Sequence, residues 1–371
     1  MTTTANTTSM SQLQTTTITR EWVEHVAVGG AVLGGGGGGS LEEGIEFGTL
    51  AIEYGTPTIV PLSALDASDT VLTVSGVGAP AATESAVNPV DYVRAVDLVV
   101  ERLADRGTGV DALMTNEMGG FAAVNGLLQS AVTGLPIVDA ACNGRAHPTG
   151  PMGSMGLSAE ETAVQAGVGG DRGAGRHHEV TVEASLQSAA SLVRQTADAA
   201  GGLVAVARNP VTAEYAGTHA AVEVYDQAEA VGRAVRQSED GVVLDRVAEA
   251  LDGDVVVSGT VESYALETTG GFDVGTAVVD GHDLTFWNEY MTLDRDGERL
   301  ATFPDLITTL DAANGEPIST ADLDEGRSVA VVVAPAASLS LGAGMTDPAL
   351  FEPIEDAVGV PILDYAFPED Y

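Results

Sequence analysis

The sequence predicts an α/β fold, with an N-terminal three-layer α/β domain around a largely parallel sheet and a β-rich C-terminal domain. Two observations support this prediction. In the first part of the chain, short β-branched runs alternate with segments of helical apolar spacing. From Asp254 onward, short strands alternate with tight turns. The 371 residues suffice for two domains, and we expect a disordered tail over 1–19, the α/β domain over 20–160 and the β-rich domain over 161–371.

Two helices are expected at the start of the α/β domain, and six consecutive glycines, Gly34 to Gly39, separate them. Thr19 is suited to cap the first helix, and Ser40, followed by two glutamates, is suited to cap the second. Ordering glycine costs much backbone entropy, so a folded chain has reason to avoid such a run. Its place between two helices disfavours a flexible linker. Two interpretations stay open, a loop whose amides cradle a ligand and a tight packing turn.

Strands and helices alternate through the rest of this domain. Strands are expected over 56–65, 69–80, 110–120 and 135–148, and helices over 88–107 and 121–134. Parallel strands end at one edge of their sheet, where α/β proteins bind ligands. We therefore expect a site at that edge, built from the loops 34–40, 75–80, 116–120 and 139–148.

The second half of the chain begins with a Gly-rich, charged stretch at 167–181 that suits a connection. The elements expected after it are a helix over 186–202, a strand over 203–212, helices around 219–237 and 242–251, and strands over 254–304 and 327–335. Trp287 and the neighbouring strand residues are interpreted as core and interdomain packing.

The charge of the chain is extreme. It carries 54 acidic and 15 basic residues, a formal net charge of -39, and every basic residue is an arginine. Such a surface repels nucleic acid and anionic membranes, and its self-repulsion destabilises the fold at low salt. Molar salt shortens the Debye length to roughly 3 Å and removes most of this cost. The composition is therefore typical of a protein from a salt-loaded cytoplasm, and it favours a haloarchaeal origin.

Further features favour a cytoplasmic protein that neither crosses nor binds a membrane. Cys142 is the single cysteine, which excludes an intrachain disulfide and fits a reducing compartment. No apolar run of about 18 residues could span a membrane. The Thr/Ser-rich start lacks the charge and apolar pattern of a signal peptide.

One candidate catalytic segment contains Asn116 and Glu117 at a strand end before two glycines. A carboxylate there could act as a general base, ligate a metal or cap the next helix. Nucleotide binding is a weaker alternative for this edge of the sheet. No lysine follows the glycine run as in a P-loop, and a string of glycines matches the dinucleotide pattern trivially.

The second candidate segment is richer, because Asp139, Cys142, Asn143, Arg145 and His147 fall within nine residues. An acid, a thiol, a guanidinium and an imidazole that close together are typical of a site on a strand-end loop. The thiol and the imidazole could pair as nucleophile and base, or share a metal with Asp139. A lone cysteine is also often a small buried apolar residue.

The motifs occur in an order that resembles the S-methyl-thiohydantoin desulfurase family, whose members often accompany hydantoinases. In chain order they are the glycine loop, "VGAP", "NEMGG" with a later asparagine, "PIVDA" with "GRAHP", "TTGGF", "NEYM" and "FPDLITTLDAANGEPIS". The resemblance runs from about residue 21 to 362. It implies an α/β N-terminal domain and a β-rich C-terminal domain, as the residue patterns do.

The resemblance transfers residue by residue, with departures. The matching positions are Gly35, Gly36, Gly37, Gly38, Gly39, Glu117, Gly119, Gly120, Asn125, Asp139, Gly144, Arg145, Ala146 and Pro148. Ser40 and Leu41 replace the family's Asp-Pro after the glycines. The family's second Asp, its Phe and its final Glu in "D-A-D-G-x-G-R-A-F-P-E" are here Ala141, His147 and Thr149. Two carboxylates are thus replaced, while a thiol and an imidazole are present.

Two functions from different classes follow from the resemblance. The first is a hydrolase-type enzyme that acts on a hydantoin-like or S-methyl-thiohydantoin cyclic amide, by thiol release or ring chemistry. The second is a non-catalytic accessory subunit of a hydantoinase assembly. A homo-oligomer is expected in either case, with a small cyclic-amide ligand and hydantoinase subunits as candidate partners.

The residues expected to carry the enzyme function form two groups. Candidate catalytic residues are Glu117, Asp139, Arg145, His147 and Cys142. Candidate substrate-binding residues are Gly35, Gly36, Gly37, Gly38, Gly39, Gly119, Gly120, Asn125 and Asn143. The cofactor is unassigned, and a divalent metal on Glu117, Asp139 and His147 is one alternative.

The charge analysis predicts that stability rises with salt. Added potassium chloride should raise the melting temperature by many degrees between dilute buffer and molar concentration, because it screens the repulsion among carboxylates. Thermal unfolding followed by circular dichroism measures the effect. A melting temperature that does not respond to salt would contradict the interpretation.

Overall fold

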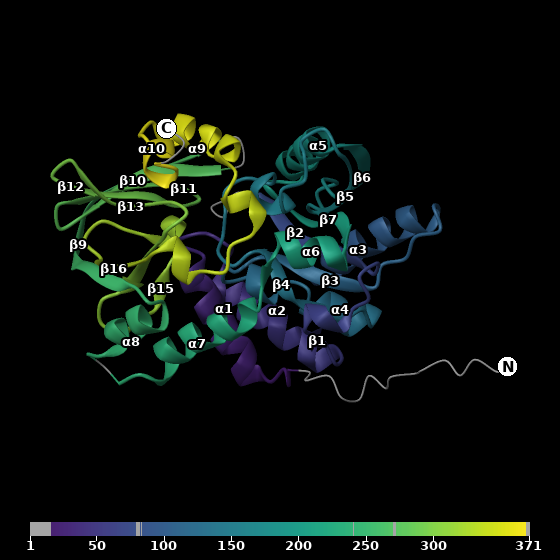
Figure 1. The fold of residues 1–371 in the computed structure, drawn as a ribbon, viewed down its shortest axis with the longest axis horizontal. Coiled ribbons are helices and arrows are strands. Elements are labelled where there is room, and N and C mark those ends of the chain that lie inside the picture. Colours follow the sequence, from purple (N-terminus) through teal and green to yellow (C-terminus); the bar gives the residue numbers. More distant parts are fainter. Residues whose placement is uncertain (1–15, 79–81, 83, 240, 270–271, 369–371) are drawn as a thin grey trace.

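The computed structural model describes residues 16–78, 82, 84–239, 241–269 and 272–368. Most of the tail expected over 1–19, and the end of the loop expected over 75–80, lie outside the described residues. The described part contains two sheets with helices around them (Figure 1). None of the described helices is long and apolar enough to cross a membrane.

The first sheet has the order β1-β4-β3-β2-β7-β5-β6, with β8 paired to β4. Its strands are β1 (Ile59–Val60), β2 (Thr70–Gly78), β3 (Ala112–Glu117), β4 (Ile137–Asn143), β5 (Thr162–Gly169), β6 (His178–Ser185), β7 (Leu203–Thr212) and β8 (Ala221–Val222). The strands β1, β4, β3 and β2 are mutually parallel, and β7, β5 and β6 extend the sheet in antiparallel pairings. The stretch 167–181 therefore contains the end of β5, the turn of the β5–β6 hairpin and the start of β6. The boundary predicted between residues 160 and 161 precedes β5, so β5 to β8 follow it along the chain.

Helices cover both faces of this sheet. They are α1 (Arg20–Leu33), α2 (Leu41–Tyr54), α3 (Pro89–Ala104), α4 (Leu127–Thr133), α5 (Leu186–Ala199), α6 (Ala213–His219) and α7 (Val224–Gln237). The next helix, α8 (Val243–Ala250), packs beside α7 against the second sheet. The main apolar core joins α1, α2, α3, α4 and α7 to one face. The helices α5 and α6 pack on the other face. Alternation along β2 produces this division, because Leu72 and Val74 face the first core while Val71 and Val77 face the second helix layer.

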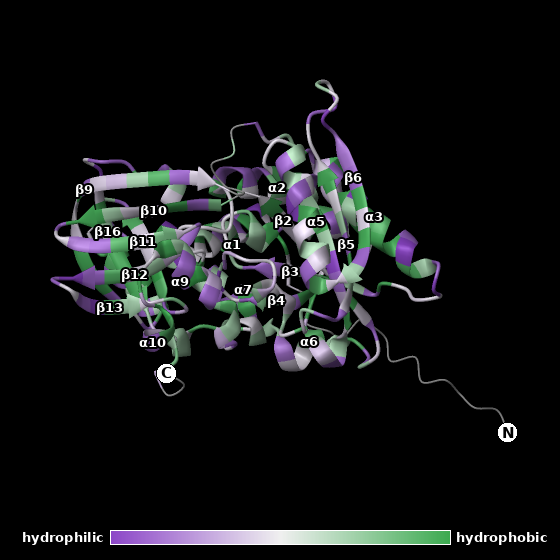
Figure 2. Cartoon of the chain, turned by 90° about the horizontal axis from the view of Figure 1, so that it is seen from above, coloured by the Kyte–Doolittle hydropathy of each residue, from purple (hydrophilic) through white to green (hydrophobic). Residues whose placement is uncertain are grey.

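The second sheet is antiparallel and has the order β13-β12-β11-β10-β9-β16-β14-β15. Its strands are β9 (Asp254–Thr269), β10 (Phe272–Val279), β11 (His282–Trp287), β12 (Glu289–Arg295), β13 (Glu298–Thr302), β14 (Leu306–Asp311), β15 (Pro317–Ile318) and β16 (Ser328–Ala334). The helices α9 (Glu352–Val358) and α10 (Leu363–Ala366) end the chain beside it. In Figure 2, the outer strand β6 carries hydrophilic residues. The predicted fold class is confirmed.

The glycine run is an ordered, largely buried turn between α1 and α2. Thr19 and Ser40 cap these helices, as the sequence predicts, since each side chain accepts a hydrogen bond from the first turn. The turn needs glycine at Gly35, Gly36, Gly38 and Gly39, where φ lies between 58° and 97°.

The carbonyl groups of this turn bond to both domains. The Gly35 carbonyl accepts a hydrogen bond from the Tyr290 amide at 2.8 Å, and the Gly36 carbonyl accepts one from the Thr320 amide at 3.0 Å. The Gly38 carbonyl accepts the amide of Phe121, which follows β3. One turn thus connects β12 and the segment after β15 to the first sheet.

Gly38 also packs directly on the backbone of Gly119. A Cβ atom at Gly119 would lie 2.4 Å from the Gly38 Cα, and one at Gly38 would lie equally close to the Gly119 Cα. Neither backbone segment can move away easily, because each is held by the hydrogen bonds of the turn. The glycines of "NEMGG" are therefore required for the contact between the two segments.

Replacing Gly119 by alanine should lower the free energy of unfolding by about 1–3 kcal/mol or more, since the added methyl group overlaps backbone atoms. Chemical denaturation in high salt measures the loss. Gly109→Ala is the matched control, because no heavy atom lies within 4 Å of the corresponding Cβ position. Equal stability of the two variants would show that the close approach is not a constraint.

Candidate functional site

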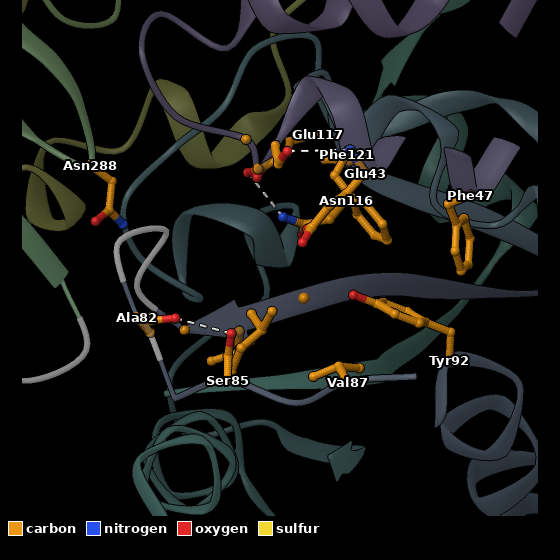
Figure 3. Close-up of a pocket in the computed structure, with 18 of the residues that line it drawn as sticks. Glu43, Phe47, Ala82, Ser85, Val87, Tyr92, Asn116, Glu117, Phe121 and Asn288 are labelled. Carbon is orange, nitrogen blue, oxygen red and sulfur yellow. Dashed lines mark hydrogen bonds between the residues drawn. The ribbon is translucent and has the colours of Figure 1, made fainter. Parts of the chain in front are cut away.

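A cavity of about 590 Å³ lies at the edge of the first sheet where β2 and β3 end, and it reaches β12 of the second sheet. Gly38, Glu117, His147, Arg208 and Glu289 are among the residues that line it. Figure 3 shows the labelled side chains of the N-terminal domain around the cavity and Asn288 on its far side. The expected site edge therefore contains a cavity that both domains enclose.

Glu117, at the end of β3, has one carboxylate oxygen held by three donors. Its Oε2 lies 2.9 Å from His147 Nδ1, accepts the Asn116 side-chain amide at 3.1 Å and accepts the His147 main-chain amide at 3.3 Å. Oε1 has no hydrogen-bond partner among the described residues, and 15% of the side chain is exposed. One oxygen is thus fixed in place while the other stays available to a ligand in the cavity.

His147 is held between two amide side chains. Asn116 Nδ2 lies 3.3 Å from His147 Nε2, and the Asn116 carbonyl oxygen accepts a hydrogen bond from Arg208 at 2.5 Å. Asn143 packs against the same imidazole, 3.2 Å from Nδ1, and donates to the Met152 carbonyl.

Glu289, at the start of β12, faces Glu117 from the second domain. The side chain is buried, and its Oε2 has no hydrogen-bond partner among the described residues. Burial, and then the nearby Glu117 carboxylate, raise the pKa of Glu289 well above its ordinary value, although Arg145 acts in the opposite direction. The cavity therefore combines a carboxylate with a carboxylic acid that stays protonated to higher pH.

The glycine turn makes room for this acid. A Cβ atom at Gly37 would lie 2.0 Å from Glu289 Oε1. Arg145 lies behind the same turn, where a Cβ atom at Gly35 would approach its Nη2 to 2.8 Å. Its guanidinium donates to the carbonyls of Pro304 and Asp305, and burial lowers its pKa to about 10. Arg145 thus connects the strand-end loop to the second domain from behind the turn, and its side chain does not line the cavity.

One wall of the cavity is aromatic. The rings of Phe47, Tyr92 and Phe121 lie with centroids 5.0 to 5.2 Å apart. All three line the cavity, and Figure 3 shows the Tyr92 hydroxyl directed toward its middle. These rings come from α2, α3 and the loop after β3, so an apolar part of a ligand could pack against this wall.

Two candidate catalytic residues lie elsewhere. Asp139 accepts the Tyr225 amide at the start of α7, at 3.2 Å. Cys142 is buried in an apolar cluster, 3.6 Å from the Thr73 hydroxyl, and burial raises its pKa to about 11. Neither Asp139 nor Cys142 lines the cavity. The structure thus brings Glu117 and His147 together and leaves Asp139 and Cys142 apart.

The candidate substrate-binding residues are divided in the same way. Gly38 and Gly39 line the cavity, whereas the remaining glycines of the turn lie behind it. Gly119 and Gly120 contact the backbone of the glycine turn and of α2. Asn125 accepts a hydrogen bond from Gln129 at 2.7 Å away from the cavity. Across the ranges that the structure describes, no three His, Cys, Asp or Glu side chains gather closely enough to hold a metal ion.

The sequence patterns did not identify several residues of the cavity as functional. Arg208, Arg194, Asn288 and Glu289 belong to this group. Asn288 and Glu289 lie within the quoted motif "NEYM", so the resemblance to the family was a signal that could have pointed to them. Arg208 carries no such signal, because it lies in none of the quoted motifs and reaches the cavity from β7, on the face that Val204 and Val206 share.

The fold and the cavity define a two-domain protein with an acidic pair between an α/β domain and a β-rich domain. The chain matches the models of the "S-Me-THD-like, N-terminal domain" over residues 21–173 and of the "S-Me-THD-like, C-terminal domain" over residues 184–344. The chain belongs to the S-Me-THD-like family.

One solved structure has a similar fold. It is the X-ray crystal structure of a protein from Chromobacterium violaceum, with 20% sequence identity and a TM-score of 0.66 over 92% of this chain and 96% of that one. No curated protein matches the chain.

The raised pKa of Glu289 predicts a pH dependence of stability. The folded protein holds this proton to higher pH than the unfolded chain does, so the free energy of unfolding falls as pH rises above the ordinary glutamate range, by at most about 1.4 kcal/mol per pH unit. Glu289→Gln should remove this slope. Denaturant midpoints measured from acidic to neutral pH test it, with the exposed Glu298→Gln as control. An unchanged slope in Glu289→Gln would contradict the assignment.

Proposed function

We propose that this protein is a hydrolase that releases a thiol from an S-methyl-thiohydantoin or a related five-membered cyclic amide. The observation that carries the proposal is the pair of glutamates in one cavity. Glu117 offers a carboxylate oxygen without a hydrogen-bond partner among the described residues, and burial raises the pKa of Glu289, so that it holds its proton to higher pH. Two carboxyl groups in different protonation states can act as general base and general acid on the same substrate.

The reaction needs both groups. Water attacks the ring carbon between the two nitrogens, Glu117 takes one of its protons, and Glu289 gives its proton to the ring nitrogen as the C=N bond opens. The hydroxyl proton then returns to Glu289 as the carbonyl forms. The C–S bond breaks with its electron pair on sulfur, and the proton on Glu117 passes to the departing thiolate. The products are the hydantoin and methanethiol, and both glutamates regain their starting states.

The remaining residues position these groups. His147 and Asn116 hold Oε2 of Glu117, so that Oε1 faces the substrate. The amides of Gly38 and Gly39 donate no hydrogen bond within the described part of the chain, and both residues line the cavity. Such amides can accept negative charge that develops on the ring.

Replacing either glutamate by glutamine should lower kcat/KM for thiol release by about a hundredfold or more, because each variant lacks one proton-transfer group. A thiol-reactive dye measures release from S-methyl-thiohydantoins in high salt. The wild type should also lose activity as pH rises through the raised pKa of Glu289.

Glu42→Gln is the matched control, since Glu42 is exposed on α2 and does not line this cavity. Cys142→Ser tests the alternative of a thiolate nucleophile, which it would abolish. If both cavity variants keep the activity of the parent, the glutamate pair is not catalytic. If the parent releases no thiol at all, the accessory-subunit alternative replaces the enzyme.

A further inference from the structure

The hydroxyl of Tyr92 faces the cavity without a hydrogen-bond partner among the described residues. Tyr92 lies on α3, and 7% of the residue is exposed. It lines the cavity, and its hydroxyl is directed toward the middle (Figure 3). A tyrosine hydroxyl that is buried usually has a partner, because an unpaired polar group in a protein interior destabilises the fold. The missing partner of Tyr92 is therefore best sought in a ligand of the cavity.

Other tyrosines of the described chain differ from Tyr92. The hydroxyls of Tyr215, Tyr264 and Tyr290 each have a partner in the protein, at 2.9, 2.6 and 3.2 Å. The buried hydroxyl of Tyr225 has none among the described residues, but Tyr225 does not line the cavity. Tyr92 and Tyr225 thus share an unpartnered hydroxyl, and the one on Tyr92 can reach a ligand.

The first turn of α3 holds Tyr92 in place. Asn88 precedes the helix, Pro89 begins it, and the Asp91 carboxylate accepts the Asn88 main-chain amide at 2.8 Å. Asp91 is fully buried, and Arg172 donates to it at 2.6 Å from the turn between β5 and β6. A hydroxyl on a ring that is fixed in this way loses little further freedom when it binds a ligand.

The aromatic wall brings Tyr92 close to the glycine turn. The centroids of the Tyr92 and Phe121 rings lie 5.2 Å apart. On its other side, Phe121 Cβ lies 2.8 Å from the Cβ position at Gly39. A single side chain therefore separates the Tyr92 ring from the turn, and a small planar ligand packed on this wall could contact both.

The environment of Tyr92 makes its hydroxyl a donor. Burial raises the pKa of Tyr92 above its ordinary value, and the carboxylates of Glu43 and Asp91 raise it further. The hydroxyl thus keeps its proton at neutral pH and can donate it in a hydrogen bond. An uncharged acceptor oxygen, such as an amide carbonyl, suits this donor.

We infer that Tyr92 is a substrate-binding residue whose hydroxyl donates a hydrogen bond to the ring carbonyl that the substrate keeps through the reaction. The inference rests on the proposed function for the nature of the ring. In that reaction Glu117 and Glu289 act on the carbon that bears the sulfur and on a ring nitrogen, so the second carbonyl needs another donor. Tyr92 therefore selects rings that carry this carbonyl over rings that lack it.

The test compares two uncharged ligands, hydantoin and ethylene urea, which is the same five-membered ring without the second carbonyl. Binding is measured by titration calorimetry at neutral pH in molar potassium chloride. The parent should bind hydantoin more tightly than ethylene urea. Tyr92→Phe should lower the affinity for hydantoin roughly five- to fiftyfold, because it leaves a buried ligand oxygen without its donor. Its affinity for ethylene urea should change little.

Tyr225→Phe is the matched control, because it removes an unpartnered hydroxyl outside the cavity, and it should keep the affinity for hydantoin. Both variants should melt at or above the temperature of the parent, since neither hydroxyl bonds to the described protein. No binding of hydantoin by the parent, an unchanged affinity in Tyr92→Phe, or an equal loss in Tyr225→Phe would overturn the inference. A lower melting temperature of Tyr92→Phe alone would assign the hydroxyl to the fold and overturn it as well.

Thiol release from S-methyl-thiohydantoins separates the two proposals. A loss of hydantoin affinity in Tyr92→Phe, with no thiol release by the parent, would support the Tyr92 contact and contradict the hydrolase. Thiol release with equal kcat/KM in the parent and in Tyr92→Phe, together with equal hydantoin affinity, would support the hydrolase and contradict the Tyr92 contact.

Discussion

The backbone contact made by Gly35 to Gly38 is the constraint on which the site depends. This turn accepts hydrogen bonds from β12 and Thr320 in the second domain and from Phe121 in the first. A side chain on any of these glycines would collide with protein atoms, and at Gly37 the atom is Glu289 Oε1. Glu117 on β3 and Glu289 on β12 can face each other only because no side chain stands between the domains here. The entropy cost of six glycines is offset by this close approach.

The same turn explains how the structure tolerates buried charge. Arg145 is fully buried, yet its guanidinium donates to main-chain carbonyls and stacks over Phe303 at 4.6 Å. It lies close enough to Glu289 that the two influence each other's pKa, while burial favours the neutral form of the acid. Arg145, which lies behind the turn, and Glu289, which lies in front of it, are therefore coupled electrostatically. A change on either side of the turn therefore alters the protonation of the acid in the cavity.

Local signals in the sequence were enough for most of the fold. Helix caps at Thr19 and Ser40, apolar spacing in α3 and the alternation of strands and helices depend on near neighbours, and they predicted the elements correctly. They also predicted that Glu117 and His147 would lie at one sheet edge. The position of Glu289 in the cavity could not be predicted in this way, because it depends on how the second sheet packs against the first domain. The burial of Cys142 in an apolar cluster outside the cavity also depends on tertiary packing, which local patterns do not reveal.

The polarity of the cavity follows from how its elements pack. The strand ends supply Glu117, Asn116 and His147 because parallel strands finish together, and α2 and α3 supply the aromatic wall because their apolar faces must cover the sheet. Arg208 lies in the same space, because regular alternation along β7 places it on the face of Val204 and Val206, and its Nη2 donates to the Asn116 carbonyl. The Asn116 amide in turn donates to Glu117 Oε2 and contacts His147 Nε2. The hydrogen-bond network thus couples the arginine side of the cavity to the Glu117 carboxylate through Asn116.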